Sequence, residues 1–408
     1  MDVLWNAIGS SLAVLTLPGT IELSVLTAAA LLPSRRTLRA PAPSSPIGSL
    51  AVTVVIPAHD EEAGIARCLA SVRACETDGE PTRIVVVADN CTDATADVAR
   101  AAGAEVIVRR DETRRGKGFA LEHAFERLLE ERTDVVVVID ADSLVDTGML
   151  RAVRNAVRAG CQAVQMRYEV ANPEASVRAR LAHVAWLAFN VLRLRGRERL
   201  GVSVGILGNG FALTTRTLRA VPYTAHGLVE DLEYHLMLVR ARVRVHYLAS
   251  TVVRAAAPTG AEAMASQRSR WDGGRLRTIA DTAPRLLGAV LRGRTNLLEP
   301  LLELSLLPLS MHVGLVAVAA LVPSPIARTY AAVAALVLAL HVVAALVVGG
   351  ARAADWRALL GAPIYVAWKL ALLPRTLLSA RRRAPWIRTE REPGAVESIE
   401  PRRYRSTG

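Results

Sequence analysis

The sequence predicts an α/β fold in which a doubly wound, mostly parallel sheet is flanked by transmembrane helices. Short apolar runs rich in valine and isoleucine alternate four times with amphipathic helical patterns between residues 51 and 158. Strands that alternate with helices in this way pair in parallel through right-handed crossovers. Longer apolar runs lie near both ends of the chain, and each is long enough to cross the ~30 Å hydrocarbon layer of a membrane as a helix.

Composition excludes several classes of protein. The net charge of +12 comes largely from arginine and would suit a nucleic-acid binder or a membrane protein with basic flanks. Because the basic residues flank the apolar runs and aromatic residues make up only 4% of the chain, we do not expect nucleic-acid binding. The four cysteines lack CxxC or zinc-type spacing and none of the eight histidines falls in an HExxH pattern, so we expect reduced core cysteines and no zinc hydrolase.

The N-terminal apolar run covers residues 7–32. No basic residue precedes it and it is longer than the apolar core of a cleaved signal, so residues 1–34 are predicted to form a transmembrane anchor. Glu22 is costly in lipid and is expected to face another helix or the interface. Three arginines between residues 35 and 39 predict that the chain continues on the cytoplasmic side, through a linker over residues 35–50.

The first strands each end in polar residues. A strand over 51–56 ends at Pro57, and the acidic segment 60–62 stands before a helix, where negative charge suits the helix dipole. A second strand over 83–88 ends at Asp89, and a third covers 105–108. Carboxyl ends of parallel strands share one edge of the sheet, so these polar groups are expected at one ligand-binding edge.

A basic turn follows the third strand. Lys117 lies between two glycines, which allow close backbone approach, and its charge suits an anionic ligand. A solvated basic turn is the alternative.

The central strand is the run over residues 135–139, and it is followed by Asp140 and Asp142. Two carboxylates this close repel each other unless a cation is near, and Mg²⁺ takes carboxylate and phosphate oxygens as ligands. The pattern therefore predicts a metal–diphosphate site. The alternative is that Asp142 or Ser143 only caps the following helix.

The second half of the domain carries two further polar groups. Glu230 and Asp231 stand at the start of a predicted helix, where capping alone could explain them. Gln267, Arg270 and Trp271 lie on a helix that we expect Gly273 and Gly274 to break. The other predicted elements are strands over 161–166 and 243–248, a long helix over 175–195 and a glycine-rich segment over 208–211.

The C-terminal region is apolar again. Runs over 297–322 and 326–348 predict a transmembrane hairpin, and a weaker run over 358–378 predicts an interfacial or re-entrant segment. The predicted organisation is an anchor over 1–34, a linker over 35–50, an α/β domain over 51–285, a hairpin over 286–350, an interfacial or re-entrant segment over 351–380 and a basic cytoplasmic tail over 381–408.

Taken together, the motifs resemble those of the membrane-bound family 2 glycosyltransferases with a GT-A fold. Within that family, they are most similar to those of the synthase-type members, such as the poly-N-acetylglucosamine, cellulose, chitin and hyaluronan synthases. The resemblance runs from about residue 53 to residue 278. Asp60 stands where the family usually has Asn. The motifs are VIPAHDEE at 55–62, DNCTD at 89–93, GKG at 116–118, DAD at 140–142, ED at 230–231 and QRSRW at 267–271.

The resemblance implies a role for each motif. Asp140 and Asp142 would hold the donor and a Mg²⁺ or Mn²⁺ ion. Asp231, with Glu230 beside it, would be the catalytic base that removes a proton from the acceptor. The other implied donor-binding residues are Pro57, Glu61, Asp89 at the nucleotide base and Lys117 near the nucleotide, and the implied diphosphate- and acceptor-binding residues are Gln267, Arg270 and Trp271.

The function implied is inverting transfer of a sugar from a nucleotide-sugar donor, UDP-linked, to a saccharide acceptor in cell-surface polysaccharide synthesis. The expected location is the plasma (inner) membrane, with several spans and a cytoplasmic catalytic domain. A polyprenyl-phosphate glycosyltransferase is the first alternative, although such enzymes typically lack the QxxRW motif. A non-catalytic membrane scaffold is the second. Expected partners are the donor, a saccharide or lipid-linked acceptor, membrane lipids, and an export partner or a second copy of the chain.

Overall fold

The computed structural model describes residues 2–33, 48–227 and 229–381. The predicted basic tail and most of the predicted linker, including Arg35, Arg36, Arg39, Arg382 and Arg383, lie outside the described residues. The chain divides into two compact units, which we call the sheet unit and the helical unit. The sheet unit comprises the described residues of 33–172 and 203–257, and the helical unit those of 2–32, 173–202 and 258–381.

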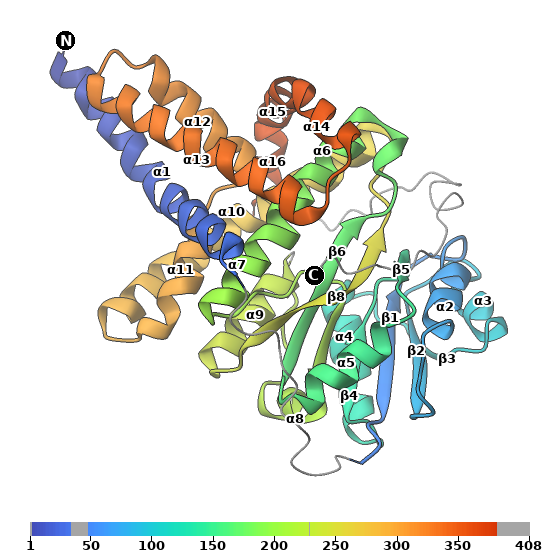
Figure 1. The fold of residues 1–408 in the computed structure, drawn as a ribbon. Helices are drawn as coiled ribbons and strands as arrows, with labels where there is room; N and C mark the ends of the chain where they lie inside the picture. Colours follow the sequence, from blue (N-terminus) through green and yellow to red (C-terminus); the bar gives the residue numbers. More distant parts are fainter. Residues whose placement is uncertain (1, 34–47, 228, 382–408) are drawn as a thin grey trace. The chain divides into compact units, whose positions relative to one another are not determined.

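The sheet unit is built on one eight-stranded sheet with the order β3-β2-β1-β4-β7-β6-β8-β5 (Figure 1). Strands β1 to β4 pair in parallel, β7 runs antiparallel to both β4 and β6, and β5 runs antiparallel to β8. The predicted α/β class with a mostly parallel sheet is therefore confirmed. The strands are β1 (Val52–Ala58), β2 (Thr82–Asp89), β3 (Glu105–Arg109), β4 (Val135–Val138), β5 (Ser143–Val145), β6 (Ala163–Val170), β7 (Phe211–Thr214) and β8 (Val245–Ala255).

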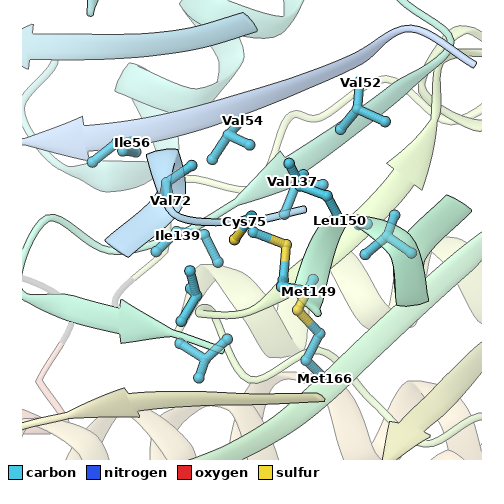
Figure 2. Packing of buried hydrophobic residues seen from close by; sticks show 14 of the residues in the cluster. Val52, Val54, Ile56, Val72, Cys75, Val137, Ile139, Met149, Leu150 and Met166 are labelled. Atoms are coloured by element: carbon cyan, nitrogen blue, oxygen red, sulfur yellow. The ribbon is translucent and has the colours of Figure 1, made fainter. Parts of the chain in front are cut away.

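Helices cover both faces of this sheet, which explains the uniformly apolar run in β4: all four of its residues are buried. On one face, alternate residues of β1 and β4 pack with α2 and α5, as Figure 2 shows for Val54, Val137 and Leu150. On the other, α4 packs on β1 and β2. The helices of the sheet unit are α2 (Ile65–Arg73), α3 (Thr95–Ala101), α4 (Lys117–Leu129), α5 (Met149–Arg158), α8 (Thr215–Ala220) and α9 (Glu230–Arg240).

The helical unit contains two helices, α1 and α13, that are long and apolar enough to cross a membrane. A third candidate is the predicted first arm of the hairpin, which is a pair of helices bent by 73° at a break before Leu309. The helices are α1 (Asp2–Leu31), α6 (Val177–Trp186), the π-helical η2 (Leu187–Leu192), α7 (Arg193–Leu200), α10 (Ala261–Leu291), α11 (Leu298–Ser305), α12 (Leu309–Leu321), α13 (Pro325–Gly349), α14 (Ala353–Ala358), α15 (Ala362–Ala371) and α16 (Leu373–Ser379), with 3₁₀ turns η1 (Pro173–Ala175), η3 (Thr295–Leu297) and η4 (Leu359–Gly361).

The predicted break at Gly273 and Gly274 is wrong, because α10 continues through both glycines. A side chain at Gly273 would place its Cβ 2.7 Å from the carbonyl oxygen of Thr376 and 2.9 Å from the Cβ of Ser379. The glycine therefore permits close approach of α16 rather than ending the helix.

Glu22 of α1 faces another helix, as predicted. Its carboxylate oxygen Oε1 lies 2.9 Å from the guanidinium of Arg193 and 2.9 Å from that of Arg197, both on α7. The acid is therefore paired with two buried cations of the same unit.

Candidate functional site

Four segments of the sheet unit meet at the carboxyl end of β4. Strand β4 leads into Asp140 and Asp142, and Val138 at its end pairs with Phe211 at the start of the antiparallel β7. The glycine-rich loop at 207–210, which precedes β7, therefore lies at the same edge. The first residues of α4 and α9 supply the remaining side chains.

Lys117 joins two of these segments. Its ammonium Nζ contacts Asp140 Oδ1 and donates a hydrogen bond of 2.7 Å to the carbonyl oxygen of Gly208. The backbone before it needs glycine, because Gly116 has a φ of 121°. A Cβ on Gly118 would lie 2.3 Å from the carbonyl oxygen of Ala225, so only glycine fits there without movement.

Burial lowers the pKa of Lys117, but the nearby charges of Asp140 and Glu230 outweigh it and raise this pKa above its usual value. The amine therefore stays protonated at neutral pH, and Lys117 is a fixed positive charge in the site.

Asn209 holds the loop against the acidic turn. Its side-chain oxygen accepts a hydrogen bond of 3.1 Å from the backbone N–H of Asp140, and its Nδ2 donates one of 2.8 Å to Ser143 Oγ. Ser143 Oγ in turn donates to Asp142 Oδ1 over 3.3 Å. Gln165 fixes the loop from β6, because its Nε2 donates to the carbonyl oxygen of Asn209 at 2.8 Å and its Oε1 accepts from the N–H of Leu207 at 2.9 Å. Sequence reasoning assigned no role to Asn209 or Gln165.

Asp231 lies beside this loop. A Cβ built on Gly208 would be 3.5 Å from Asp231 Oδ2, and Asp231 Oδ1 accepts a hydrogen bond of 2.8 Å from the backbone N–H of Leu232. The structure thus brings Lys117, Asp140 and Asp231 around Gly208.

Glu230 is the titrating group of the site. Burial and the negative charge of Asp231 raise its pKa from 4.5 to about 7, although Lys117 acts in the opposite direction. Close to neutral pH, Glu230 therefore exchanges between its neutral and charged forms.

A pH dependence of stability follows from this pKa. Between pH 4.5 and about 7 the folded protein keeps a proton on Glu230 that the unfolded chain has released, so its contribution to stability falls as the pH rises through that window. We expect the wild-type melting temperature to fall more steeply across this window than that of Glu230→Gln, which cannot titrate there. Thermal unfolding of both proteins in one buffer series measures the difference, and equal slopes would contradict the assignment.

Asp89 is held in a buried ion pair. Arg109 Nη1 donates a hydrogen bond of 2.6 Å to Asp89 Oδ1, and the side chains of both residues are 7% exposed. Asn90 donates to the same oxygen over 3.1 Å. Because this pairing fixes the carboxylate at the end of β2, Asp89 is positioned at the ligand-binding edge; its contact with a nucleotide base stays a prediction.

Pro57 and Glu61 lie at the end of β1 and in the loop after it. The backbone N–H of Glu61 donates a hydrogen bond of 2.7 Å to Thr95 Oγ1, which fastens this loop to the start of α3. Their predicted contacts with the donor are not tested by these hydrogen bonds.

Two groups of residues have the chemistry to hold a metal. Among the described residues, Asp60, Cys91 and Asp93 place possible ligand atoms within 4.8 Å of one another, but Asp60 Oδ1 already accepts from the N–H of Thr92 at 2.7 Å. The predicted pair, Asp140 and Asp142, offers carboxylate oxygens, which Mg²⁺ and Mn²⁺ prefer. Asp140 also attracts the ammonium of Lys117, so a cation is already favoured at its carboxylate. The pair therefore fits a hard divalent ion.

Gln267, Arg270 and Trp271 belong to the helical unit, on α10. The guanidinium carbon of Arg268 lies 5.3 Å from the centroid of the Trp271 ring, and the Trp186 ring lies 6.3 Å from it at 39°. These neighbours fix the orientation of the indole. The binding roles of the three motif residues stay predictions.

The mixed sheet, with acids and a lysine at the carboxyl edge of its central strand, defines a GT-A-like transferase fold. The chain belongs to the glycosyltransferase-like family 2, whose model matches residues 50–274. It is similar to the low-salt glycan biosynthesis hexosyltransferase Agl6 of Haloferax volcanii, with 39% identity over 109 residues, which are 27% of this chain and 25% of that protein. It is also similar to the probable glycosyltransferase YdaM of Bacillus subtilis, with 24% identity over 231 residues, or 54% of each protein.

The chain therefore spans between a quarter and about half of the length of these curated relatives. Among solved structures, it resembles the mannosyltransferase PcManGT from Pyrobaculum calidifontis in complex with GDP-Man and Mn²⁺. The TM-score is 0.56 at 18% identity, and the match covers 92% of this chain and 98% of that one. This likeness shows a shared fold, and the family supports a sugar-transferring enzyme.

Proposed function

We propose that this protein is an inverting glycosyltransferase that moves a hexose from a nucleotide-sugar donor, UDP-linked, to a saccharide acceptor in cell-surface polysaccharide synthesis. The observation that carries the proposal is the grouping around Gly208. Lys117 donates to its carbonyl oxygen at 2.7 Å, and Asp231 Oδ2 lies 3.5 Å from where its Cβ would be. A cation for a diphosphate and a carboxylate for a hydroxyl proton thus lie beside one loop.

The acceptor hydroxyl and the leaving diphosphate need different catalytic groups. Asp231 is the proposed general base, because a sugar hydroxyl keeps its proton at neutral pH and attacks only as that proton is removed. Lys117 binds the donor diphosphate with its protonated ammonium. A Mg²⁺ or Mn²⁺ ion held by Asp140 and Asp142 would supply Lewis-acid stabilisation of the charge that grows on the leaving diphosphate. The acceptor oxygen then displaces the diphosphate in one step, with inversion of the anomeric carbon.

The remaining motif residues complete the proposal. Asp89 contacts the nucleotide base, and Pro57 and Glu61 line the donor site. Arg270 offers a guanidinium fork to phosphate oxygens, and Gln267 and Trp271 contact the acceptor sugar. The ion pair with Arg109 fixes the position of Asp89, which supports its proposed contact with the nucleotide base.

A transfer assay tests the reaction class. The purified full chain is supplied with UDP-hexoses and GDP-mannose, and with an oligosaccharide or a polyprenyl phosphate as acceptor. We expect transfer from a UDP-hexose to the oligosaccharide, with a product of inverted anomeric configuration by NMR. Transfer to the polyprenyl phosphate alone would replace the proposal by a lipid-phosphate glycosyltransferase, and no transfer with any pair would favour a scaffold.

The metal proposal predicts a change in donor binding. Asp142→Asn removes one carboxylate charge from the metal pair, so we expect Mn²⁺-dependent binding of UDP to weaken by on the order of tenfold, the effect of losing one charged hydrogen-bonding partner. Calorimetry with and without EDTA measures it. Asp97→Asn serves as a control, because Asp97 is an exposed acid that pairs with Arg100 on α3. Equal UDP affinity of wild type in Mn²⁺ and in EDTA would remove the metal from the scheme.

We further propose that the protein is a multi-pass protein of the plasma membrane with the sheet unit in the cytoplasm. Two helices of sufficient length and the predicted basic flanks support this. A cysteine introduced at the exposed Ser49 should react with an impermeant maleimide only after the cells are opened. Reaction in intact cells would reverse the topology.

A further inference from the structure

The Lys117 ammonium contacts the Asp140 carboxylate, which is also a proposed metal ligand. Nζ contacts Asp140 Oδ1, and both side chains are largely buried, at 24% and 30% exposed. Its second partner, the Gly208 carbonyl oxygen, is fixed by the loop that Asn209 and Gln165 hold. The Lys117 ammonium is thus held at two points, by Asp140 Oδ1 and by the Gly208 carbonyl oxygen.

An ammonium and a divalent cation compete for such an oxygen. Both are attracted by the same negative charge, and placing them at the same oxygen brings like charges into contact. A metal that binds through Oδ1 displaces the ammonium, and Lys117 has the flexible stem that lets it move. Its charge then loses the contact with the Asp140 carboxylate, although the charges of Glu230 and Asp231 on α9 still act on it. A diphosphate that enters with the metal supplies a new anion.

From these contacts we infer that Lys117 is the resident counter-cation of Asp140, and that it transfers to the donor diphosphate when the metal takes its place. The inference rests on the proposed function, since it assumes that Asp140 is a metal ligand. It goes further, because it predicts that the nucleotide increases the affinity of the protein for the metal. The metal alone binds weakly because it must displace Lys117 from Asp140, and the nucleotide offsets that cost by binding the displaced ammonium.

The chain offers a matched control. Lysine occurs at only two positions, 117 and 369. Lys369 lies in the helical unit, where its Nζ is 2.8 Å from Asp272 Oδ2, and its side chain is 13% exposed. Lys369→Met therefore removes the same charge from a lysine–aspartate pair that contains neither of the proposed metal ligands.

The experiment measures Mn²⁺ binding directly, from the electron paramagnetic resonance signal of free Mn²⁺, with the purified full chain. Each protein is titrated with Mn²⁺ alone and with saturating UDP. We expect Lys117→Met to bind Mn²⁺ alone tighter than wild type by on the order of tenfold, the effect of removing one charge-assisted hydrogen bond. We also expect UDP to increase Mn²⁺ affinity less in this variant than in wild type. Lys369→Met should match wild type in both titrations.

Two further variants secure the interpretation. Lys117→Gln should bind Mn²⁺ as tightly as Lys117→Met does. Adding Asp140→Asn to Lys117→Gln should abolish the gain in Mn²⁺ affinity, because the gain depends on the carboxylate that Lys117 no longer contacts. If Lys117→Met and Lys117→Gln bind Mn²⁺ no more tightly than wild type, the inference about Lys117 is overturned and the proposed function is not affected. Absence of Mn²⁺ binding by every protein, with UDP present, would overturn both the inference and the metal in the proposed function.

Discussion

Asp231→Asn should lower kcat by on the order of 10²–10⁴-fold while the affinity for the donor stays nearly unchanged. The reason is that asparagine has the shape of aspartate but cannot take a proton from a hydroxyl. The carboxylate is positioned for this task, since Oδ1 is held by the N–H of Leu232 at 2.8 Å while Oδ2 lies beside Gly208. In the proposed scheme, donor binding depends on other groups, Lys117 and the acidic pair after β4, so it should survive.

The measurement separates binding from transfer. UDP affinity is determined by calorimetry, and single-turnover transfer to an oligosaccharide gives the chemical step. Glu230→Gln is the matched control, because it neutralises the neighbouring acid and leaves Asp231 in place. We expect a much smaller loss of kcat for it, and a shift in the pH profile near 7, the pKa of Glu230. A kcat for Asp231→Asn within a few-fold of wild type would contradict the general base and favour an acceptor that is already ionised, such as a lipid phosphate.

Much of the fold could be predicted because the central strands are buried on both faces. Such strands leave uniform apolar runs in the sequence, and β1, β2 and β4 were each visible in this way. Strands β5 and β7 were not predicted, since three and four residues are too few to show a pattern. The two glycines in α10 were misread for another reason: local propensity favours a break, but packing against α16 overrides it.

The same distinction applies to the site. The charged residues of the candidate site stand in short motifs, so they could be proposed from the sequence. Asn209 was not, because its contacts are with Gln165, 44 positions away, and with Ser143, 66 positions away. Its only local signal is a pair of flanking glycines, both with positive φ. Likewise, the raised pKa of Glu230 arises from residues that only the folded chain brings together.

The helical unit contains a group of buried, charged side chains whose pairing the sequence did not predict. This group gives the second large prediction. Arg197 of α7 is 2% exposed and pairs with three acids: Glu22 of α1 at 2.9 Å, Glu299 of α11 at 3.1 Å and Glu303 of α11 at 2.9 Å. Nothing in the sequence indicated this group, because the three acids come from two helices other than α7. Burial alone would lower the pKa of Arg197, but the three carboxylates raise it above its usual value.

Arg197→Met should therefore destabilise the protein strongly. Removing one partner of a buried ionic group leaves uncompensated charge behind and costs about 3–5 kcal/mol. Here the charge left behind is that of three carboxylates, and Glu22 retains a second cation, Arg193. The expected result is a lower melting temperature in detergent.

The control is Arg352→Met, which removes an arginine from a surface pair in the same unit. Arg352 lies 3.1 Å from Glu174, and the two side chains are 63% and 57% exposed. Water already compensates both charges there, so its loss should cost about 0–1 kcal/mol. Differential scanning fluorimetry of the two variants and wild type in one detergent measures the difference. Arg197→Lys should recover little, because one ammonium cannot reach the three carboxylates that the guanidinium fork spans. Equal melting temperatures for Arg197→Met and Arg352→Met would show that the acids are solvated or neutral, and that Arg197 does not hold α1 and α11 to α7.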